Sequence, residues 1–291
     1  MGLNVKVSVI IPTYNREDTI LNSVQSVLSQ NYSNIEVIVV DDHSLDNTMR
    51  ILDNISDERF KYIVLEENMG ACFARNFGIK KSTGEIIAFQ DSDDVWQPDK
   101  LEIQLNCLKK YHADICFCAY TKNGKIFPKM SEGVYSHEQL SCNSLASTQT
   151  IIAKKNIFPG CLFNEKMPRL QDFDWMIRAS RNNIVCFSNH SLVNVYVQKN
   201  SISRNSEKFF YALNYLINEN RTIEKENPQI LLSWMNLLAA EHARNGKSTA
   251  QIYKEMLNYS NNRVIYIKYF LAKLNLITYY YKLRGYVKNE D

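Results

Sequence analysis

The first 120 residues alternate between short apolar runs and longer segments in which apolar positions have helical spacing. A nearly continuous apolar run such as Val5 to Ile11 is typical of a strand covered on both faces. From Glu17 to Gln30, apolar residues recur every three or four positions, as in an amphipathic helix. The pattern predicts strands at 5–11, 35–40, 60–65, 85–90 and 115–119, and helices at 17–30, 46–55, 71–81 and 98–111. This alternation predicts an α/β fold with a mainly parallel sheet flanked by helices.

The chain changes character after this region. Residues 120–200 mix short strands and loops, with one helix expected from Asp172 to Ser180. Beyond residue 205 the spacing is helical throughout, and it predicts helices at 209–225, 228–245, 249–259 and 264–283. We therefore expect a main domain at 1–205, made of halves 1–120 and 121–205, and a C-terminal helical extension at 206–291.

Composition excludes several classes of protein. The 34 Lys and Arg residues against 31 Asp and Glu residues give a net charge of +3, too balanced to indicate nucleic-acid binding. The N-terminal run lacks the pattern of a signal peptide, and no charge-free apolar stretch is long enough to span a membrane. We expect a cytoplasmic protein with reduced cysteines. The protein could lie in the cytoplasm or at the inner face of the cell membrane. Cys116 and Cys118 lie in an apolar run without a second ligand pair, which favours a buried strand over a metal site.

Polar residues follow the predicted strands where each strand ends. Thr13-Tyr14-Asn15 follows the first strand, Asp41-Asp42 the second, and Asp91-Ser92-Asp93-Asp94 the fourth. The carboxyl ends of parallel strands meet at the edge where such sheets bind ligands. Clustered carboxylates raise one another's pKa or require a cation, and Mg²⁺ or Mn²⁺ prefers oxygen ligands. We therefore expect a divalent metal that binds a nucleotide diphosphate; the alternative is that single Asp residues only cap helices.

Four sequence blocks follow one another between about residues 5 and 205: VSVIIPTYNRE, EVIVVDDHSLDNT, NMGACFARNFGIKKSTGEIIAFQDSDDVWQPDKL and PGCLFNEKMPRLQDFDWMIRAS. Together they resemble the family 2 glycosyltransferases. The resemblance implies a GT-A fold, in which a nucleotide-sugar half joins an acceptor half. It also implies that a sugar is transferred from a UDP-sugar with inversion at the anomeric carbon. The processive signature Gln-x-x-Arg-Trp is absent after Asp172, which favours transfer of a single sugar.

The resemblance also implies roles for individual residues. Asp172 matches the acidic residue that acts as general base, although Gln171 stands before it where many relatives have Glu. Asp93 matches the last Asp of the DXD motif, which contacts the metal. Gln198 stands where relatives often have a His that helps to hold the metal. The positions that match the nucleotide site are Pro12, Thr13, Tyr14, Asp42, Arg75, Asp91 and Ser92.

General chemistry is compatible with these roles. Inverting transfer needs one carboxylate to take a proton from the acceptor hydroxyl, and a metal to stabilise the leaving diphosphate. Without the resemblance, the simpler interpretation is that Asp172 lies at a helix N-terminus because the helix dipole favours an acidic residue there. For Trp96 and Trp175 two interpretations stay open, namely a stacking surface in the acceptor and sugar pocket, or burial beneath a helix.

The segment from Arg263 to Lys288 is basic and rich in tyrosine. It has six basic residues and no acidic ones. This composition suits a membrane interface, where Tyr lies at headgroup depth and Lys or Arg meets anionic lipid. Its apolar face is interrupted, however, because basic residues fall on opposite sides of the predicted helix. Packing on the main domain or a homodimer contact is an equally good interpretation.

These observations predict an inverting glycosyltransferase that acts on a growing, lipid-linked glycan in the synthesis of a bacterial surface polysaccharide. The alternatives are a sugar nucleotidyltransferase, or an inactive glycan-binding or scaffold protein. A nucleotidyltransferase needs a glycine-rich basic loop after the first strand, and PTYNRE contains no Gly. Loss of Asp93 or Asp172 would favour an inactive protein, and both are present.

Overall fold

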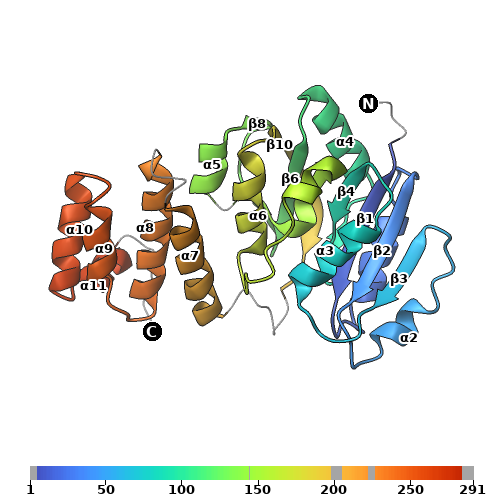
Figure 1. Ribbon diagram of the computed structural model, residues 1–291, viewed down its shortest axis with the longest axis horizontal. Coiled ribbons are helices and arrows are strands. Elements are labelled where there is room, and N and C mark those ends of the chain that lie inside the picture. The colour runs from blue at the N-terminus through green and yellow to red at the C-terminus, as the bar shows by residue number, and fades with distance from the viewer. Residues whose placement is uncertain (1–4, 144, 198–204, 222–226, 284–291) are drawn as a thin grey trace. The chain divides into compact units, whose positions relative to one another are not determined.

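In the computed structural model of this protein, a mixed sheet forms the centre of the first of two units (Figure 1). The structure describes residues 5–143, 145–197, 205–221 and 227–283. Within these ranges, the first unit contains residues 5–167 and 171–197, and the second contains residues 168–170 and 205–283.

One half of the sheet is parallel, as the sequence predicts. Its strands are β1 (Val7–Thr13), β2 (Ile35–Asp41), β3 (Phe60–Val64) and β4 (Ile86–Phe89), in the order β3-β2-β1-β4. Every residue of β1, β2 and β4 is buried, because helices cover both faces of these strands. Thr13 lies beside Asp41 in the register, so the ends of β1 and β2 are level.

The other half of the sheet is mixed. The strand β9 (Ile151–Lys154) runs antiparallel between β4 and β6 (Ile115–Lys122), and β10 (Val185–Val195) pairs with β6 in parallel. The short strands β5 (Val95–Trp96), β7 (Lys125–Phe127) and β8 (Gly133–Tyr135) add antiparallel pairs. The predicted mixed, mainly parallel sheet is confirmed. The position of β9 was not predictable, because a run of four residues does not reveal its neighbours.

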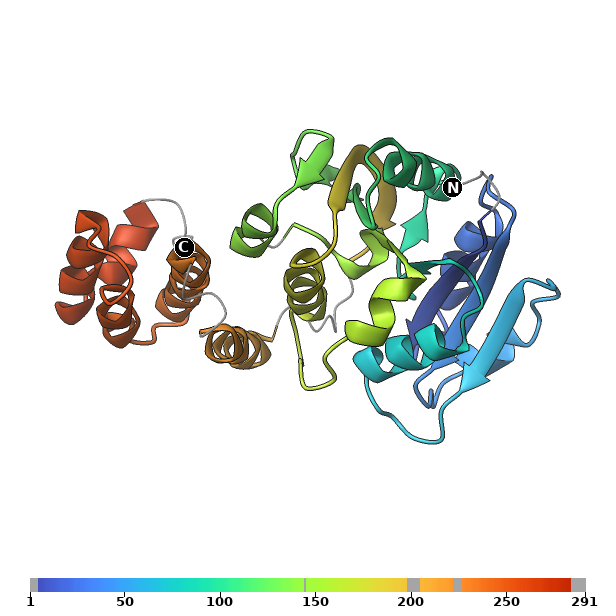
Figure 2. The same ribbon diagram turned by 45° about the horizontal axis from the view of Figure 1, so that its top comes forward.

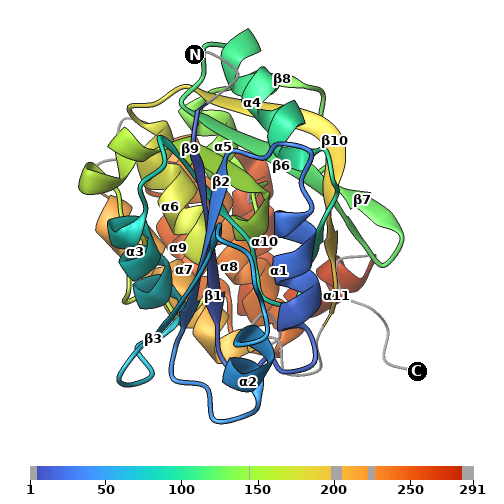
Figure 3. The same cartoon turned by 90° about the vertical axis from the view of Figure 1, so that its right-hand side faces the viewer.

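Helices cover both faces of the sheet. The helices α1 (Ile20–Leu28) and α4 (Lys100–Lys110) pack on one face, while α3 (Ala71–Lys81) and α6 (Gln171–Ser180) pack on the other. Figure 3 shows α1 and α3 on opposite sides of β1 and β2. Shorter helical segments are α2 (Thr48–Leu52), α5 (His137–Cys142), η1 (Thr148–Thr150) and η2 (Lys155–Gly160).

A glycine lets α3 lie directly on the sheet. A Cβ atom at Gly78 would come within 2.6 Å of the Ile10 side chain in β1, so a larger residue would push the helix outwards. Arg75 lies one turn earlier and is itself buried. The close approach of α3 therefore places the Arg75 guanidinium near the ends of the strands.

The second unit is helical. Its helices are α7 (Ser206–Asn220), α8 (Pro228–Arg244), α9 (Ala250–Met256), α10 (Arg263–Lys273) and α11 (Ile277–Leu283) (Figures 1 and 2). The prediction of a single helix at 264–283 is wrong, because Asn275 adopts a left-handed conformation with φ of 58°. The amides of Asn275 and Leu276 donate to the carbonyls of Ala272 and Leu271, at 3.2 and 2.8 Å. This pattern is the Schellman motif that ends many helices, and Asn tolerates its left-handed position.

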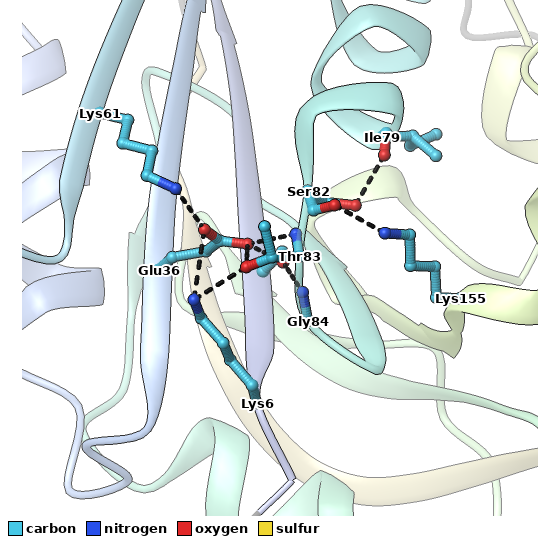
Figure 4. Close-up of polar contacts among 9 residues, drawn as sticks. Lys6, Glu36, Lys61, Ile79, Ser82, Thr83, Gly84 and Lys155 are labelled. Atoms are coloured by element: carbon cyan, nitrogen blue, oxygen red, sulfur yellow. Dashed lines mark hydrogen bonds and ion pairs between the residues drawn. The ribbon is translucent and has the colours of Figure 1, made fainter.

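A buried carboxylate fastens the turn between α3 and β4 to the sheet. Glu36 of β2 accepts hydrogen bonds from Ser8 Oγ (2.5 Å), Lys61 Nζ (2.7 Å) and the Thr83 amide (2.6 Å). Figure 4 shows this carboxylate between Lys61 and Thr83. Burial alone would raise the pKa of the Glu36 carboxyl, but these hydrogen bonds hold it well below its usual range. Glu36 thus stabilises the start of β4, whose other end leads into the acidic run.

We expect Glu36→Gln to lower the free energy of unfolding by about 2–3 kcal/mol at pH 7, because a buried charge-assisted network is broken. A depressed carboxyl pKa contributes stability above the unfolded pKa, and that contribution is lost as the pH falls towards the folded pKa. The difference between wild type and variant should thus be constant above about pH 5 and shrink below about pH 4. Urea unfolding followed by circular dichroism measures it. Glu58→Gln, at an exposed position, is the control; equal losses for both variants would contradict the prediction.

Candidate functional site

The carboxyl ends of β1, β2 and β4 bring the predicted polar residues to one edge of the sheet. The Asp42 amide donates to the Thr13 carbonyl at 2.8 Å, so the segments after β1 and β2 run side by side. Further on, the Asn15 amide donates to Ser44 Oγ at 2.9 Å, and the Leu45 amide donates to Asn15 Oδ1 at 2.8 Å. These bonds join the two loops into one surface at the strand ends.

Three of the five clustered carboxylates are held by other parts of the protein. Asp41 accepts from Tyr62 Oη (2.6 Å) and the Ser44 amide (2.8 Å). Asp42 accepts from the amides of Met69 and Gly70, at 2.7 and 2.8 Å, and so anchors the loop before α3. Asp94 is buried and accepts from the Tyr196 amide at 3.0 Å. Among the described residues these three carboxylates orient loops, which leaves Asp91 and Asp93 as the members of the cluster that could serve a cation.

Of the other two carboxylates, Asp93 lines a cavity and Asp91 is paired with Arg75. Asp93 lies 3.9 Å from the Arg16 guanidinium and lines a cavity of ≈ 490 Å³. The other residues that line this cavity are Thr19, Asn22, Gln25, Val95 and Tyr196. Burial raises the pKa of the Asp93 carboxyl and the charge of Asp91 raises it further, while Arg16 opposes both effects. Asp93 is thus an accessible carboxylate whose charge is incompletely compensated by the protein.

Arg75 connects the acidic run to α6. One terminal nitrogen of its guanidinium donates to Asp91 Oδ1 at 2.9 Å, and the other donates to Gln171 Oε1 at 3.0 Å. The side chain is buried and lies over the Phe163 ring, 5.6 Å from its centroid. Both terminal nitrogens of Arg75 thus have a partner within the protein, and the expected contact of Arg75 with a nucleotide stays a prediction.

Asp172 lies in the first turn of α6, directly after the residue held by Arg75. Its Oδ1 accepts from the Phe173 amide at 2.8 Å. Burial raises the pKa of the Asp172 carboxyl, and the nearby charge of Asp91 adds to the rise against the Phe173 amide and Arg75. The pKa of the Tyr120 hydroxyl is also raised. Burial is the main cause, and the charges of Asp172 and Asp94 add to it. A carboxyl group whose pKa is raised by burial and by a neighbouring carboxylate is a candidate for proton transfer.

The predicted nucleotide positions differ in accessibility. Tyr14 is exposed, whereas Pro12 and Ser92 are buried. Thr13 is buried, and its hydroxyl has no hydrogen-bond partner within the part of the chain that the structure describes. A buried unpaired hydroxyl at a strand end is costly unless a ligand or water satisfies it. The assignment of these residues to a nucleotide stays a prediction.

The two tryptophans predicted for the sugar and acceptor pocket are buried instead. Trp175 is stacked on Phe158 and Phe163, at centroid distances of 5.5 and 5.8 Å, and donates to the Cys161 carbonyl at 2.8 Å. Trp96 is covered by α4, and Lys100 Nζ lies 3.9 Å from its ring centroid. Both indoles are almost completely buried, which favours burial beneath a helix, the second of the two interpretations, over a stacking surface for a sugar. Gln198, the other tentative metal ligand, lies outside the described residues.

The structure adds site residues that sequence reasoning missed. Arg16 belongs to the first family block, and a basic residue two positions beyond Tyr14 was a usable signal. Tyr196 gave no signal, because it reaches the cavity only through the pairing of Val193 with Trp96 and of Asn194 with Val95.

Two other features lie away from the strand ends. A cavity of ≈ 260 Å³ is lined by Val5, Tyr32, Lys154 and residues of α4, at the opposite edge of the sheet. The ligand atoms of Cys107, Cys116 and Cys186 lie within 4.8 Å of one another beneath α4. Cys116 and Cys118 are fully buried in β6, as predicted. Burial raises the pKa of Cys116 well above its usual value, which disfavours the thiolate that metals require.

Comparison with known proteins decides the family. The family model described as "Glycosyl transferase family 2" matches residues 8–163, which is more than half of the chain. The chain belongs to glycosyl transferase family 2. This match contains the ends of β1, β2 and β4, and therefore Asp42, Arg75 and Asp93.

Several relatives of this family 2 protein are named as glycosyltransferases. A putative teichuronic acid biosynthesis glycosyltransferase, TuaG of Bacillus subtilis, is 38% identical over 158 residues, which cover 54% of this chain and 60% of that protein. The UDP-Glc:alpha-D-GlcNAc-diphosphoundecaprenol beta-1,3-glucosyltransferase WfgD of Escherichia coli is 44% identical over 114 residues, which cover 39% of this chain and 45% of that protein. The family 2 chain thus matches less than two thirds of the length of these relatives.

Solved structures share the fold of the family 2 protein. The crystal structure of S. aureus TarS 1-349 in complex with UDP-GlcNAc has a TM-score of 0.74 and 21% identity, covering 98% of this chain and 93% of that chain. The mannosyltransferase PcManGT from Pyrobaculum calidifontis, in complex with GDP-Man and Mn²⁺, has a TM-score of 0.59 and 16% identity, covering 96% and 87%. The predicted family and GT-A fold are confirmed. No helix among the described residues is long and apolar enough to cross a membrane.

We expect Arg75→Met to lower the free energy of unfolding by about 3 kcal/mol, because it leaves Asp91 and Gln171 without their buried partner. Urea unfolding measures the loss. The control is Lys80→Met, which removes the same charge from an exposed position of the same helix and should change stability by less than about 0.5 kcal/mol. Similar values for both variants would show that the bridge contributes nothing to stability.

Proposed function

We propose that this family 2 protein transfers one sugar from a UDP-sugar to a lipid-linked glycan acceptor, with inversion, in the synthesis of a bacterial surface polysaccharide. The observation that carries the proposal is the bridge of Arg75 between Asp91 and Gln171. It connects the donor motif of the family with the helix turn that bears Asp172. A transferase needs these two groups on either side of one reacting carbon.

Asp172 acts as the general base in this proposal. Its carboxylate takes the proton of the acceptor hydroxyl while the hydroxyl oxygen attacks the anomeric carbon of the donor. The raised pKa supports the role, because a base accepts a proton more readily as its pKa approaches the working pH. The Phe173 amide holds Oδ1 at 2.8 Å, which orients the carboxylate and leaves its other oxygen for the acceptor.

Asp93 holds a divalent cation on the donor diphosphate in this proposal. A divalent cation suits this position because the Asp93 carboxylate lines a cavity and its ion pair with Arg16 is long, at 3.9 Å. Asp91 is already paired with Arg75, so Asp93 is the better ligand of the two. When bound, Mg²⁺ or Mn²⁺ would supply Lewis-acid stabilisation of the leaving diphosphate. Arg16 lies where it could pair with the same phosphates.

The substrate classes rest on the relatives. The printed name of WfgD specifies UDP-Glc and a diphosphoundecaprenol-linked acceptor, and TuaG is named for teichuronic acid biosynthesis. TarS binds UDP-GlcNAc in its crystal structure. From these names we infer a UDP-sugar donor and a lipid-linked acceptor for this protein.

We expect Asp172→Asn to lower kcat by about 10²- to 10⁴-fold, the usual contribution of a general base. The affinity for UDP should stay within about threefold of wild type, because the change lies on the acceptor side. In wild type, kcat/KM should fall as the pH decreases through the pKa of Asp172, which lies above the ordinary Asp value of about 3.9. The variant should lose this acidic limb.

The measurements are UDP release with a lipid-diphosphate sugar acceptor, and calorimetric titration with UDP. Asp53→Asn, at an exposed position of the same unit, is the control and should retain full activity. If Asp172→Asn abolished UDP binding, or transferred sugar at the wild-type rate, Asp172 would not be the base.

We expect Asp93→Asn to weaken UDP binding in Mn²⁺ by about tenfold or more, since it removes a ligand of a hard cation. In EDTA the two proteins should bind UDP equally. Calorimetry with and without Mn²⁺ gives both comparisons. A variant with the Mn²⁺ dependence of wild type would place the metal on other residues.

A further inference from the structure

The outer face of α10 and α11 is apolar although it has no cover within the described part of the second unit. Its members, the α10–α11 face, are Tyr266, Ile267, Phe270, Leu274, Leu276 and Tyr279. The Ile267, Phe270 and Tyr279 side chains are 56%, 63% and 69% exposed. Three large side chains with more than half of their surface in water mark an interaction site rather than isolated surface residues.

Three of these residues make one stripe along α10. Ile267, Phe270 and Leu274 lie three and four positions apart and therefore share a side of α10. Ile265 and Ala272 lie on the opposite side and are buried in the helical unit. The helix is thus apolar on both its inner and its outer surface, which a helix that faces only water would not need.

The stripe carries positive charge and no negative charge. Arg263 and Lys273 are exposed at the two ends of α10. The sequence has no acidic residue between Glu255 and Glu290. Lys268 points inwards, where its Nζ lies 5.7 Å from the Tyr281 ring centroid and donates to Asn236 Oδ1 at 3.2 Å. Lys268 is therefore half-buried and held by the helical unit, so it does not interrupt the exposed apolar side of α10.

The face belongs to well-packed helices. Tyr253 of α9 and Tyr281 of α11 are buried, and their hydroxyls lie 2.5 Å apart. The Schellman turn at Asn275 fixes the direction in which α11 leaves α10. These contacts hold the exposed residues of both helices in place before any partner binds.

We propose that the α10–α11 face docks on the surface of a bilayer that contains anionic lipid. Tyrosine rings suit the headgroup region, apolar side chains enter the acyl boundary, and Arg263 with Lys273 meets lipid phosphate. A helix of 11 residues is too short to span, so it lies in the plane of the membrane. A second copy of the chain is a poorer occupant, because a symmetric contact would oppose like charges. Docking does not depend on the catalytic proposal.

The test is cosedimentation of the full chain with vesicles of phosphatidylcholine alone, or with phosphatidylglycerol added, without donor or acceptor. Binding should require the anionic lipid. Removing both charges with Arg263→Gln and Lys273→Gln should lower the partition coefficient by about 25-fold at low salt, about fivefold for each. Ile267→Glu with Phe270→Glu should abolish sedimentation with an unchanged melting temperature, because both side chains are exposed.

Tyr211→Glu is the control, since Tyr211 is exposed on α7 of the same unit and should leave sedimentation unchanged. Equal binding to both vesicle types, or charge variants that bind like wild type, would overturn the proposal. Light scattering checks the other occupant: a dimer that becomes monomeric in the Ile267→Glu, Phe270→Glu variant would assign the face to a second copy of the chain. Because no sugar is transferred in this assay, its outcome is separate from that of the Asp172 experiments.

Discussion

The buried guanidinium of Arg75 is the contact on which the site depends. Charged groups in a protein interior need partners, and this one finds a carboxylate after β4 and an amide at the start of α6. The two partners lie far apart in the sequence, so the bridge fixes the donor motif relative to Asp172. Gly78 makes the bridge geometrically accessible, because it lets α3 approach β1 closely. The side chain predicted to lie near the nucleotide thus also holds two parts of the site together.

Much of the fold was predictable because a parallel sheet covered on both faces leaves a strong trace in the sequence. Runs such as Val7–Thr13 are mainly apolar and buried along their whole length, and the turns after them are polar. The predicted residues of the nucleotide half do lie at one edge. What the sequence could not reveal is how each carboxylate is used. Asp42 and Asp93 are the same residue type after two strands of the parallel half, yet the first holds backbone amides and the second lines a cavity.

The sequence also does not reveal which aromatic and basic residues are buried and which are exposed. Trp175 and Phe270 are both large and apolar, and the local sequence does not show which is buried. Trp175 on α6 is stacked on Phe158, whereas Phe270 on α10 is exposed. The difference arises from tertiary packing, in which Phe158 and Phe163 cover the indole. Likewise Lys268 and Lys273 look equivalent in the sequence, but the first is half-buried against Tyr281 and the second is exposed. Composition indicates what a segment can do, and packing decides which of its residues do it.

The antiparallel strand β9 has a consequence for how the protein is made. It lies between β4 and β6 in the sheet but follows both in the chain. During synthesis, β4 therefore has an open edge until residues 151–154 emerge, and β6 cannot take its final place before then. Pairings between distant segments form late, and exposed strand edges invite association with other chains. The nascent chain thus has a window, about sixty residues long, in which the β4 edge is open to association with other chains.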